Sequence, residues 1–299
     1  MKSQYITPVV TVFDDKGQID NEQNLQVYQF LNNKVSGFVV MGSTGEFFSL
    51  NMHASKQLIK LCSTAPREHM KIYAGASRMD IQESIELANY ADEMGLDGVM
   101  IISPYYFPLT QEAIYDFYST IASQTRAKIF IYNFPDRTGY SIAPQTCLKL
   151  ADKYPHIVGL KDTILDTIHT CEVINLVKKE IPNFQVFSGF DNNFAHNILA
   201  GGNGCIGGLS NIVPEFFASW MDAFAQNNLA SIAQHQKTVD QLMAVYNVNN
   251  PFISTLKKAL QLRGVIRSDR SYPPFNCLDD SQVKLLRGIL ENANVQLKK

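Results

Sequence analysis

The stretch "KIFIYNFPDRTGYSIAPQTCLKLADKYPHIVGLKD" (residues 128–162) decides the fold class. Its two ends, 128–135 and 156–162, are short apolar runs rich in β-branched residues, and its middle, 143–154, carries apolar residues at helical spacing. Near-continuous apolar runs of this length are typical of strands buried on both faces, as in a parallel sheet. The stretch therefore predicts a strand–helix–strand unit whose second strand ends in a lysine, Lys161.

The same unit recurs along the chain. Further strand-like runs lie at 7–13, 37–42, 71–76, 98–104, 184–189 and 204–210, and helical patterns lie at 21–34, 79–95, 110–125 and 166–179. The expected strand ends near 75, 104, 132, 161 and 189 are separated by 29, 28, 29 and 28 residues. This even period predicts an α/β fold of the (β/α)8 TIM-barrel type. The alternative, a doubly wound open sheet, is disfavoured because the first βα turn lacks a GxGxxG motif.

The domain organisation follows from this pattern. We expect a (β/α)8 barrel over residues 1–214. From "VPEFFASWMDAFAQ" onward the sequence has helical patterns only. We therefore expect residues 215–299 to form a C-terminal helical extension that includes the last barrel helix.

The composition excludes several classes of protein. Hydrophobic residues make up 45% of the 299 residues, charged residues 18%, and the formal net charge is −2, so nothing favours nucleic acid or an anionic membrane as a partner. The absence of a long apolar run or a signal-peptide pattern predicts a cytoplasmic protein. The five cysteines show no CxxC spacing and the six histidines no metal-binding pattern, so neither a disulfide framework nor a zinc site is expected.

Active sites of TIM barrels lie at the carboxyl ends of the strands, which places Lys161 at the catalytic end of the sixth strand. A lysine there could simply face solvent. A lysine held in a dry site instead remains a neutral amine that attacks a keto group, and the resulting iminium withdraws electrons from the adjacent carbon. Asp162 points to the other face of the strand, so we expect it to be a structural partner rather than a base.

The end of the second strand reads "GSTGE" (42–46). Glycines let backbone N–H groups turn toward a ligand, and Ser43 and Thr44 add hydroxyl groups, so this motif could bind a carboxylate or a phosphate. A plain glycine-rich turn with a capping hydroxyl is an equally good interpretation. Glu46 could cap or buttress the loop.

Two further strand ends, those of the fourth and fifth strands, carry polar side chains. Tyr132 ends the fifth strand and could pass protons beside an amine or a hydroxyl relay, although a core tyrosine with one backbone partner is the alternative. Tyr105 and Tyr106 have the same ambiguity. Arg137, on the loop after the fifth strand, suits a carboxylate but could equally be a surface arginine.

These motifs together resemble one family. With "GSTGE" at the second strand, "YNFPDRTG" (132–139) at the fifth and "GLKDT" (159–163) at the sixth, the chain resembles the pyruvate-dependent Schiff-base aldolases and lyases of the dihydrodipicolinate synthase and N-acetylneuraminate lyase family. The resemblance runs over nearly the whole chain. Within that family, the sequence most resembles the 2-keto-3-deoxygluconate-type aldolases.

The resemblance implies catalytic roles. Lys161 matches the lysine that forms a Schiff base with pyruvate, so no other cofactor is implied. Tyr132 matches the tyrosine that relays protons to and from the substrate, and Thr44 matches a hydroxyl link in that relay. Tyr106 matches a relay tyrosine contributed across a tight dimer interface. The family also implies a homotetramer built as a dimer of dimers.

The resemblance also implies binding roles. Ser43 and Thr44 match the cradle for the pyruvate carboxylate, while Gly189 and Ile206 match backbone positions that line the pyruvate pocket. The second substrate, an aldehyde, is expected to depend on Arg137 and Asp191. Arg137 fits the arginine that holds the carboxylate of aspartate semialdehyde in the synthase, whereas Asp191 could bind the hydroxyl groups of a sugar acid.

The expected function is therefore a carbon–carbon lyase that reversibly cleaves a 2-keto-3-deoxy sugar acid to pyruvate and an aldehyde. The first alternative is 4-hydroxy-tetrahydrodipicolinate synthase, which condenses pyruvate with aspartate semialdehyde. An N-acetylneuraminate lyase is a weaker alternative, because Asn192 stands where those lyases typically have Glu. A non-catalytic paralogue is a further one. A metal-dependent aldolase is disfavoured because the strand ends offer no set of metal ligands.

Overall fold

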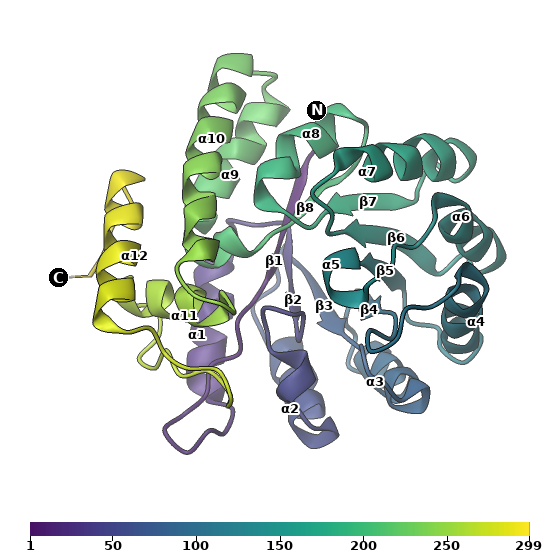
Figure 1. Ribbon diagram of the computed structural model, residues 1–299, viewed down its shortest axis with the longest axis horizontal. Coiled ribbons are helices and arrows are strands. Elements are labelled where there is room, and N and C mark those ends of the chain that lie inside the picture. Colours follow the sequence, from purple (N-terminus) through teal and green to yellow (C-terminus); the bar gives the residue numbers. More distant parts are fainter. Residues whose placement is uncertain (299) are drawn as a thin grey trace. The chain divides into compact units, whose positions relative to one another are not determined.

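The computed structural model describes residues 1–298, in which strands and helices alternate (Figure 1). The strands are β1 (Gln4–Pro8), β2 (Gly37–Val40), β3 (Lys71–Gly75), β4 (Gly98–Ile102), β5 (Ile129–Asn133), β6 (Ile157–Asp162), β7 (Gln185–Ser188) and β8 (Gly204–Ile206). They pair in chain order into a closed barrel, and the pairings of β1 with β2 and of successive strands from β3 to β8 are parallel. The predicted TIM barrel is confirmed.

Helices follow the strands and extend beyond the last of them. Those of the first seven βα units are α1 (Asn21–Leu31), α2 (Met52–Ser63), α3 (Ile81–Glu93), α4 (Gln111–Ala122), α5 (Pro135–Thr138), α6 (Pro144–Lys153), α7 (Thr167–Val173) and α8 (Phe194–Leu199). After β8 come α9 (Pro214–Ala225), α10 (Leu229–Leu242), α11 (Ile253–Leu262) and α12 (Asp280–Asn292). Side-chain caps at Asp20, Asn51, Asp80, Thr110, Asp166, Asn228 and Asp279 accept a backbone N–H of the first turn and fix where their helices begin.

The first strand begins and ends earlier than the predicted 7–13. Val9 N still donates to the carbonyl oxygen of Val39 in β2 at 3.0 Å, but two N–H groups further along bond to side chains. Val10 donates to Oδ1 of Asn211 at 3.2 Å, and Val12 donates to Oδ1 of Asn24 at 3.0 Å. The apolar run is buried as expected, but buried asparagines replace the ladder, which a hydrophobic pattern does not reveal.

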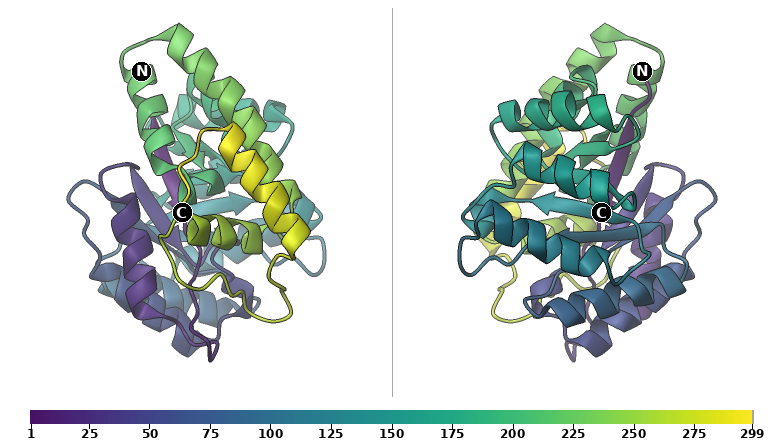
Figure 2. Two further views of the ribbon diagram at one scale, coloured as in Figure 1. Left: turned by 90° about the vertical axis from the view of Figure 1, so that its left-hand side faces the viewer. Right: turned by 90° about the vertical axis from the view of Figure 1, so that its right-hand side faces the viewer.

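The chain divides into two compact units, Met1–Lys71 with Gly207–Lys299, and Ile72–Ile206. In the second unit, α3, α4, α6 and α7 follow one another along the strands and neighbouring helices contact each other (Figure 2, right). In the first unit, α12 lies beside α10 and α11 (Figure 2, left). The predicted division into residues 1–214 and 215–299 stays a prediction.

The core of each unit is dense with aromatic side chains. In the first unit Tyr5 of β1 stacks on Phe217 of α9 with ring centroids 4.0 Å apart. In the second, Phe130 of β5 packs against Phe187 of β7 at 6.0 Å. Such contacts fix the strands whose ends carry the polar residues.

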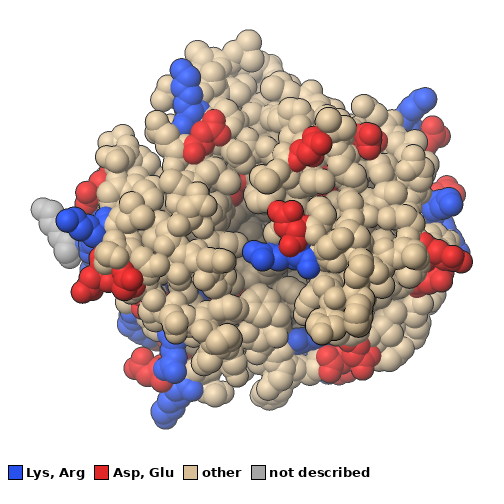
Figure 3. Space-filling view, in the orientation of Figure 1, with Lys and Arg blue, Asp and Glu red and all other residues tan. Residues whose placement is uncertain are grey.

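Three further features concern the surface charge, the helices and the arrangement of metal-ligand side chains. On the face seen in Figure 3, Lys and Arg side chains are interspersed with Asp and Glu, and no large area has one sign of charge. Among residues 1–298, no helix has the length and apolarity needed to cross a membrane. The same residues contain no cluster of three or more His, Cys, Asp or Glu side chains arranged to hold a metal ion.

Candidate active site

Lys161 and Tyr132 form the centre of the candidate site. They are register partners on the adjacent strands β6 and β5. The Nζ atom of Lys161 lies 4.3 Å from the ring centroid of Tyr132, and the two residues are 5% and 4% exposed. A solvent-facing lysine is thereby excluded, and the pairing of amine and phenol expected from the sequence is present.

The surroundings of Lys161 distinguish it from an ordinary buried lysine. Within residues 1–298, no carboxylate lies at ion-pair distance from its Nζ atom. The Nζ atom instead lies over the face of the Tyr132 ring. A buried lysine is usually held by an acidic group, because the isolated ammonium is costly to desolvate. An amine without such a group is available to react with a carbonyl.

Asp162 lies on the opposite face of β6, where it accepts three hydrogen bonds. Asn133 Nδ2 donates to Oδ1 at 2.8 Å, while Thr170 Oγ1 and His169 Nδ1 reach Oδ2 at 2.7 and 2.8 Å. His169 Nε2 lies 2.9 Å from the carbonyl oxygen of Ile142. Both ring nitrogens of His169 face acceptors, an arrangement that favours the imidazolium form. Burial lowers its pKa, but the hydrogen bond and charge of Asp162 outweigh this and leave the pKa above its ordinary value.

This network fixes the two strands immediately beside the reactive pair. Asn133 and Asp162 are themselves register partners, one position beyond Tyr132 and Lys161. Their side-chain hydrogen bond joins the two strand ends on the face away from the amine. Asp162 therefore has the structural role expected from strand alternation.

Gly189 and Thr163 pack directly against each other. A Cβ atom on Gly189 would lie 1.8 Å from Thr163 Oγ1, so no other residue fits there. Thr163 is 4% exposed, and its Oγ1 atom has no hydrogen-bond partner among the described residues. The sequence interpretation missed Thr163, although its position two residues after Lys161 is a signal, since that spacing repeats the same face of a strand.

Asp191 and Ile206 are both buried in the second unit. Asp191 begins a short 3-10 turn (Asp191–Asn193) after β7, and Ile206 ends β8. Their positions at strand ends agree with the expectation. Their assigned contacts with substrate stay predictions.

Arg137 and Tyr106 are both on the surface of the chain. Arg137, in α5, is exposed, stands 5.7 Å from the ring centroid of Phe134 and has no ion pair within residues 1–298. Tyr106, after β4, is 77% exposed, and its ring meets that of Phe107 edge-on at 4.8 Å. A single chain thus leaves both side chains open to another molecule.

The "GSTGE" motif forms a tight turn in the first unit. Glu46 N donates to the carbonyl oxygen of Ser43 at 3.2 Å, and Thr11 Oγ1 donates to that of Gly45 at 2.8 Å. Gly45 has no room for a side chain, because a Cβ atom would lie 2.9 Å from Met41 N. Thr44 is buried and Ser43 is half-buried. The conformation of this turn is therefore set by its surroundings.

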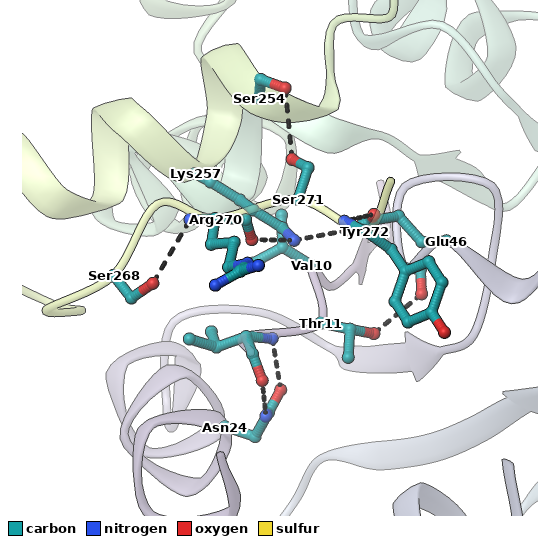
Figure 4. Close-up of polar contacts among 12 residues, drawn as sticks. Val10, Thr11, Asn24, Glu46, Ser254, Lys257, Ser268, Arg270, Ser271 and Tyr272 are labelled. Carbon is teal, nitrogen blue, oxygen red and sulfur yellow. Dashed lines mark hydrogen bonds and ion pairs between the residues drawn. The ribbon is translucent and has the colours of Figure 1, made fainter. Parts of the chain in front are cut away.

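The turn ends in a buried acid. Glu46 has a left-handed backbone (φ 59°), which is uncommon outside glycine. Its carboxylate pairs with Lys257 of α11 and accepts the backbone N–H of Tyr272 at 2.8 Å (Figure 4). The sequence predicted Glu46 to be a cap or a buttress, and the structure shows a buttress. Its partner Lys257 was missed by the sequence interpretation.

The closed barrel places the chain in the class of (β/α)8-barrel proteins, and a buried lysine and tyrosine are paired at two neighbouring strand ends. Within that class, the dihydrodipicolinate synthetase family model matches residues 1–293, and the chain belongs to this family.

Its relatives carry two kinds of name. The chain is 33% identical over 274 residues, 91% of each sequence, to the probable 2-dehydro-3-deoxy-D-pentonate aldolase YjhH of Escherichia coli. It is also 33% identical to the 4-hydroxy-tetrahydrodipicolinate synthase of Syntrophus aciditrophicus, covering 96% of this chain and 97% of that one. Among solved structures it resembles E. coli YagE in complex with pyruvate, with a TM-score of 0.95, 28% identity and coverage of 98% and 99%. These relatives include both an aldolase and a synthase.

Proposed function

We propose that the protein is a Schiff-base-forming pyruvate aldolase that reversibly cleaves a 2-keto-3-deoxy sugar acid to pyruvate and an aldehyde. The observation that carries the proposal is the buried Lys161 amine, 4.3 Å from the Tyr132 ring and without an acidic partner in residues 1–298. Membership of the dihydrodipicolinate synthetase family supports it.

The proposed reaction uses Lys161 as the nucleophile. Its neutral amine adds to the C2 keto group, and the carbinolamine loses water to give an iminium. The C3–C4 bond then breaks, its electron pair passes into the iminium to form an enamine, and the C4 hydroxyl proton is relayed through Tyr132. The aldehyde leaves. Protonation of C3 and addition of water release pyruvate and regenerate the amine.

The proposal assigns the substrate carboxylate to the Ser43–Thr44 turn. Glycine-flanked turns of this kind present N–H and hydroxyl donors to an anion. The fixed conformation of the turn supports this role, because preorganised donors lose little entropy on binding. Thr44 would also link the substrate to Tyr132 in the proton relay.

The sugar-acid assignment has support from Thr163. A buried hydroxyl without a partner costs free energy unless a ligand satisfies it, and a substrate hydroxyl would do so. The name of the pentonate aldolase relative points the same way. Asp191 is proposed as a second hydroxyl-binding residue.

Arg137 is the observation that favours the second candidate, 4-hydroxy-tetrahydrodipicolinate synthase. Its exposed guanidinium has no acidic partner in the described chain and could hold the carboxylate of aspartate semialdehyde. Substitution by Ala should then raise KM for an acidic aldehyde far more than for a neutral one. Equal effects would identify a structural arginine.

The reaction class is tested by trapping. Borohydride with pyruvate should add mass irreversibly at Lys161, as located by peptide mass spectrometry. Lys161→Ala should remain unlabelled, whereas Lys178→Ala, which removes a half-buried lysine of the same unit, should label like the wild type. Labelling of Lys161→Ala at the wild-type level would overturn the assignment.

The aldehyde is tested by parallel assays. Pyruvate release from 2-keto-3-deoxygluconate, 2-keto-3-deoxypentonate and N-acetylneuraminate is measured beside condensation of pyruvate with aspartate semialdehyde. We expect cleavage of a deoxy sugar acid to be fastest, and Thr163→Val to raise its KM without preventing trapping by pyruvate. Fast condensation without cleavage would favour the synthase, and no trapping or turnover at all would favour a non-catalytic paralogue.

The proposal includes a homotetramer in which Tyr106 acts across a dimer interface. The exposed rings of Tyr105, Tyr106 and Phe107 support an interface at this loop, since large exposed apolar side chains are unusual on monomers. Light scattering of the wild type and of Tyr106→Ser tests this. A monomeric wild type with full activity would contradict it.

A further inference from the structure

Glu46 and Lys257 form an ion pair whose two side chains are fully buried. The Lys257 ammonium also donates to the carbonyl oxygen of Arg270 at 2.8 Å (Figure 4). It lies 4.6 Å from the ring centroid of Phe13. Burial lowers the pKa of Lys257, and the charge of Glu46 opposes this. A carboxylate, a carbonyl oxygen and an aromatic face around one amine all favour its protonated form.

A contribution to stability is a weak explanation for such a pair. Desolvation of two charges consumes much of their attraction, and apolar residues of similar volume often serve as well. Buried ion pairs can instead fix one local arrangement. The pair must therefore be judged by what it holds in place.

What it holds is the end of the Ser43–Thr44 turn. One carboxylate oxygen of Glu46 bonds to Lys257 and the other accepts the N–H of Tyr272, so the side chain is fixed at both oxygens. The Glu46 backbone N–H bonds to the carbonyl oxygen of Ser43 at 3.2 Å. Because Glu46 has a left-handed backbone, its side-chain anchors select a conformation that an unrestrained chain seldom adopts.

The anchors come from the C-terminal part of the chain. Lys257 lies on α11, and the segment Arg270–Tyr272 follows that helix. Ser271 of this segment is itself held by Ser254, whose hydroxyl oxygen lies 3.2 Å from that of Ser271 (Figure 4). Further along, Phe275 meets Phe48 edge-on at 5.5 Å. The segment is thus joined both to α11 and to the residues that follow the turn.

We propose that Glu46 and Lys257 are positioning residues for the carboxylate-binding turn, and that the segment Arg270–Tyr272 is therefore part of the substrate-binding apparatus. The inference rests on the proposed function, in which Ser43 and Thr44 receive the carboxylate of pyruvate. Loss of the pair relaxes the turn and weakens selection for a carboxylate. Loss of the pair should leave the Lys161 amine unchanged. The side-chain hydrogen bonds described for Glu46 and Lys257 involve neither Lys161 nor any other residue of β6.

The test compares a ketone that has a carboxylate with one that lacks it. Borohydride trapping at Lys161 is measured by intact mass as a function of pyruvate and, separately, of hydroxyacetone. In Lys257→Met we expect the half-saturating pyruvate concentration to rise about tenfold, as for misaligned bonds to a charged group. The value for hydroxyacetone and the fraction trapped at saturation should stay near those of the wild type.

Lys258→Met is the matched control. This neighbouring lysine of α11 pairs with Asp269 at 2.6 Å but is partly exposed and does not touch Glu46. Its trapping curves should match those of the wild type. Should Lys257→Met fail to fold, Glu46→Gln keeps the shape and an acceptor for Tyr272 N–H, and it should change the pyruvate value in the same direction.

The outcomes separate the two proposals. If wild-type protein is not trapped by pyruvate, the proposed function is wrong. If it is trapped, and folded Lys257→Met and Glu46→Gln keep the wild-type ratio between the pyruvate and hydroxyacetone values, the positioning role is wrong. An equal rise for both ketones would also overturn it, because it would show general damage rather than loss of carboxylate selection.

Discussion

Glu46 ends the turn after β2 in one unit and Asp162 ends β6 in the other, and these two buried carboxylates are bonded in different ways. Glu46 is neutralised by Lys257, which is 211 residues away in sequence. Asp162 is satisfied by Asn133, Thr170 and His169, all within 29 residues. Each carboxylate has both oxygens bonded, yet one depends on a single distant charge and the other on several local donors.

This difference predicts how much stability is lost when one partner of each carboxylate is removed. Removal of Lys257 leaves a buried charge with only one N–H donor, whereas removal of any one partner of Asp162 leaves two others. A buried charge without compensation costs more than one missing hydrogen bond. The anchoring of Glu46 should therefore be the more fragile of the two, and the network around Asp162 should depend on pH through His169.

The largest expected effect is that of Lys257→Met on stability. We expect the free energy of unfolding to fall by about 3–5 kcal/mol, because Glu46 stays buried without its counter-charge. Urea unfolding followed by circular dichroism measures this. Lys258→Met should lose less than about 1 kcal/mol, since its pair is partly exposed. If Lys257→Met and Lys258→Met lost similar amounts of unfolding free energy, the buried pair with Glu46 would be no more important than the partly exposed pair with Asp269.

Asp162→Asn should have the next largest effect, a loss of about 2 kcal/mol. The amide offers one acceptor oxygen, so its NH2 group must face a donor, either Asn133 on one side or His169 and Thr170 on the other. The same unfolding assay applies. Asp152→Asn, an exposed acid on α6, should leave the midpoint unchanged.

His169 should give a smaller effect that depends on pH. Its folded pKa is raised, so the stability gained from the imidazolium is fully present below its unfolded value of about 6.5 and is lost as pH rises through the folded value. We expect wild type to exceed His169→Gln by about 1 kcal/mol at pH 6, and by less as pH rises. Unfolding midpoints over a pH series measure the difference. Lys257→Met keeps His169, so the difference between wild type and Lys257→Met should not shrink as pH rises, and a decrease like that of His169→Gln would contradict the comparison.

The smallest effect is expected for the double variant Glu46→Gln/Lys257→Met. With both charges removed, no ion remains to be desolvated, and we expect stability within about 1 kcal/mol of the wild type. The half-saturating pyruvate concentration for trapping should nonetheless stay raised, because methionine at position 257 cannot hold the side chain at position 46 as the ammonium does. A double variant as unstable as Lys257→Met alone would show that packing, not charge, accounts for the loss.

Much of the fold could be predicted because parallel strands buried on both faces leave an unmistakable apolar pattern. The regular 28–29-residue spacing of strand ends then indicated closure, and the observed ends at 75, 102, 133, 162 and 188 lie close to the predicted ones. The first strand was misplaced, since burial alone does not say whether backbone groups bond to a strand or to the amides of Asn24 and Asn211.

The site was partly predictable for a related reason. Lys161 and Tyr132 are polar residues at the ends of apolar strands, where their chemistry is conspicuous. Lys257 is concealed in a charged-looking stretch, "LKKAL" (256–260). Its signal is its position between Ile253 and Leu260 on the apolar face of α11, four residues after one and three before the other. The pairing with Glu46 could not be predicted, because helical periodicity carries no information on long-range partners.

The distance in sequence between Glu46 and Lys257 also has a consequence for synthesis on the ribosome. The acid emerges early, but its counter-charge and the Tyr272 amide are translated more than 200 residues later. A nascent chain must therefore keep this carboxylate hydrated until the C-terminal helices dock, since burial without a partner is costly. Completion of the turn therefore requires that the chain has been made and folded as far as Tyr272.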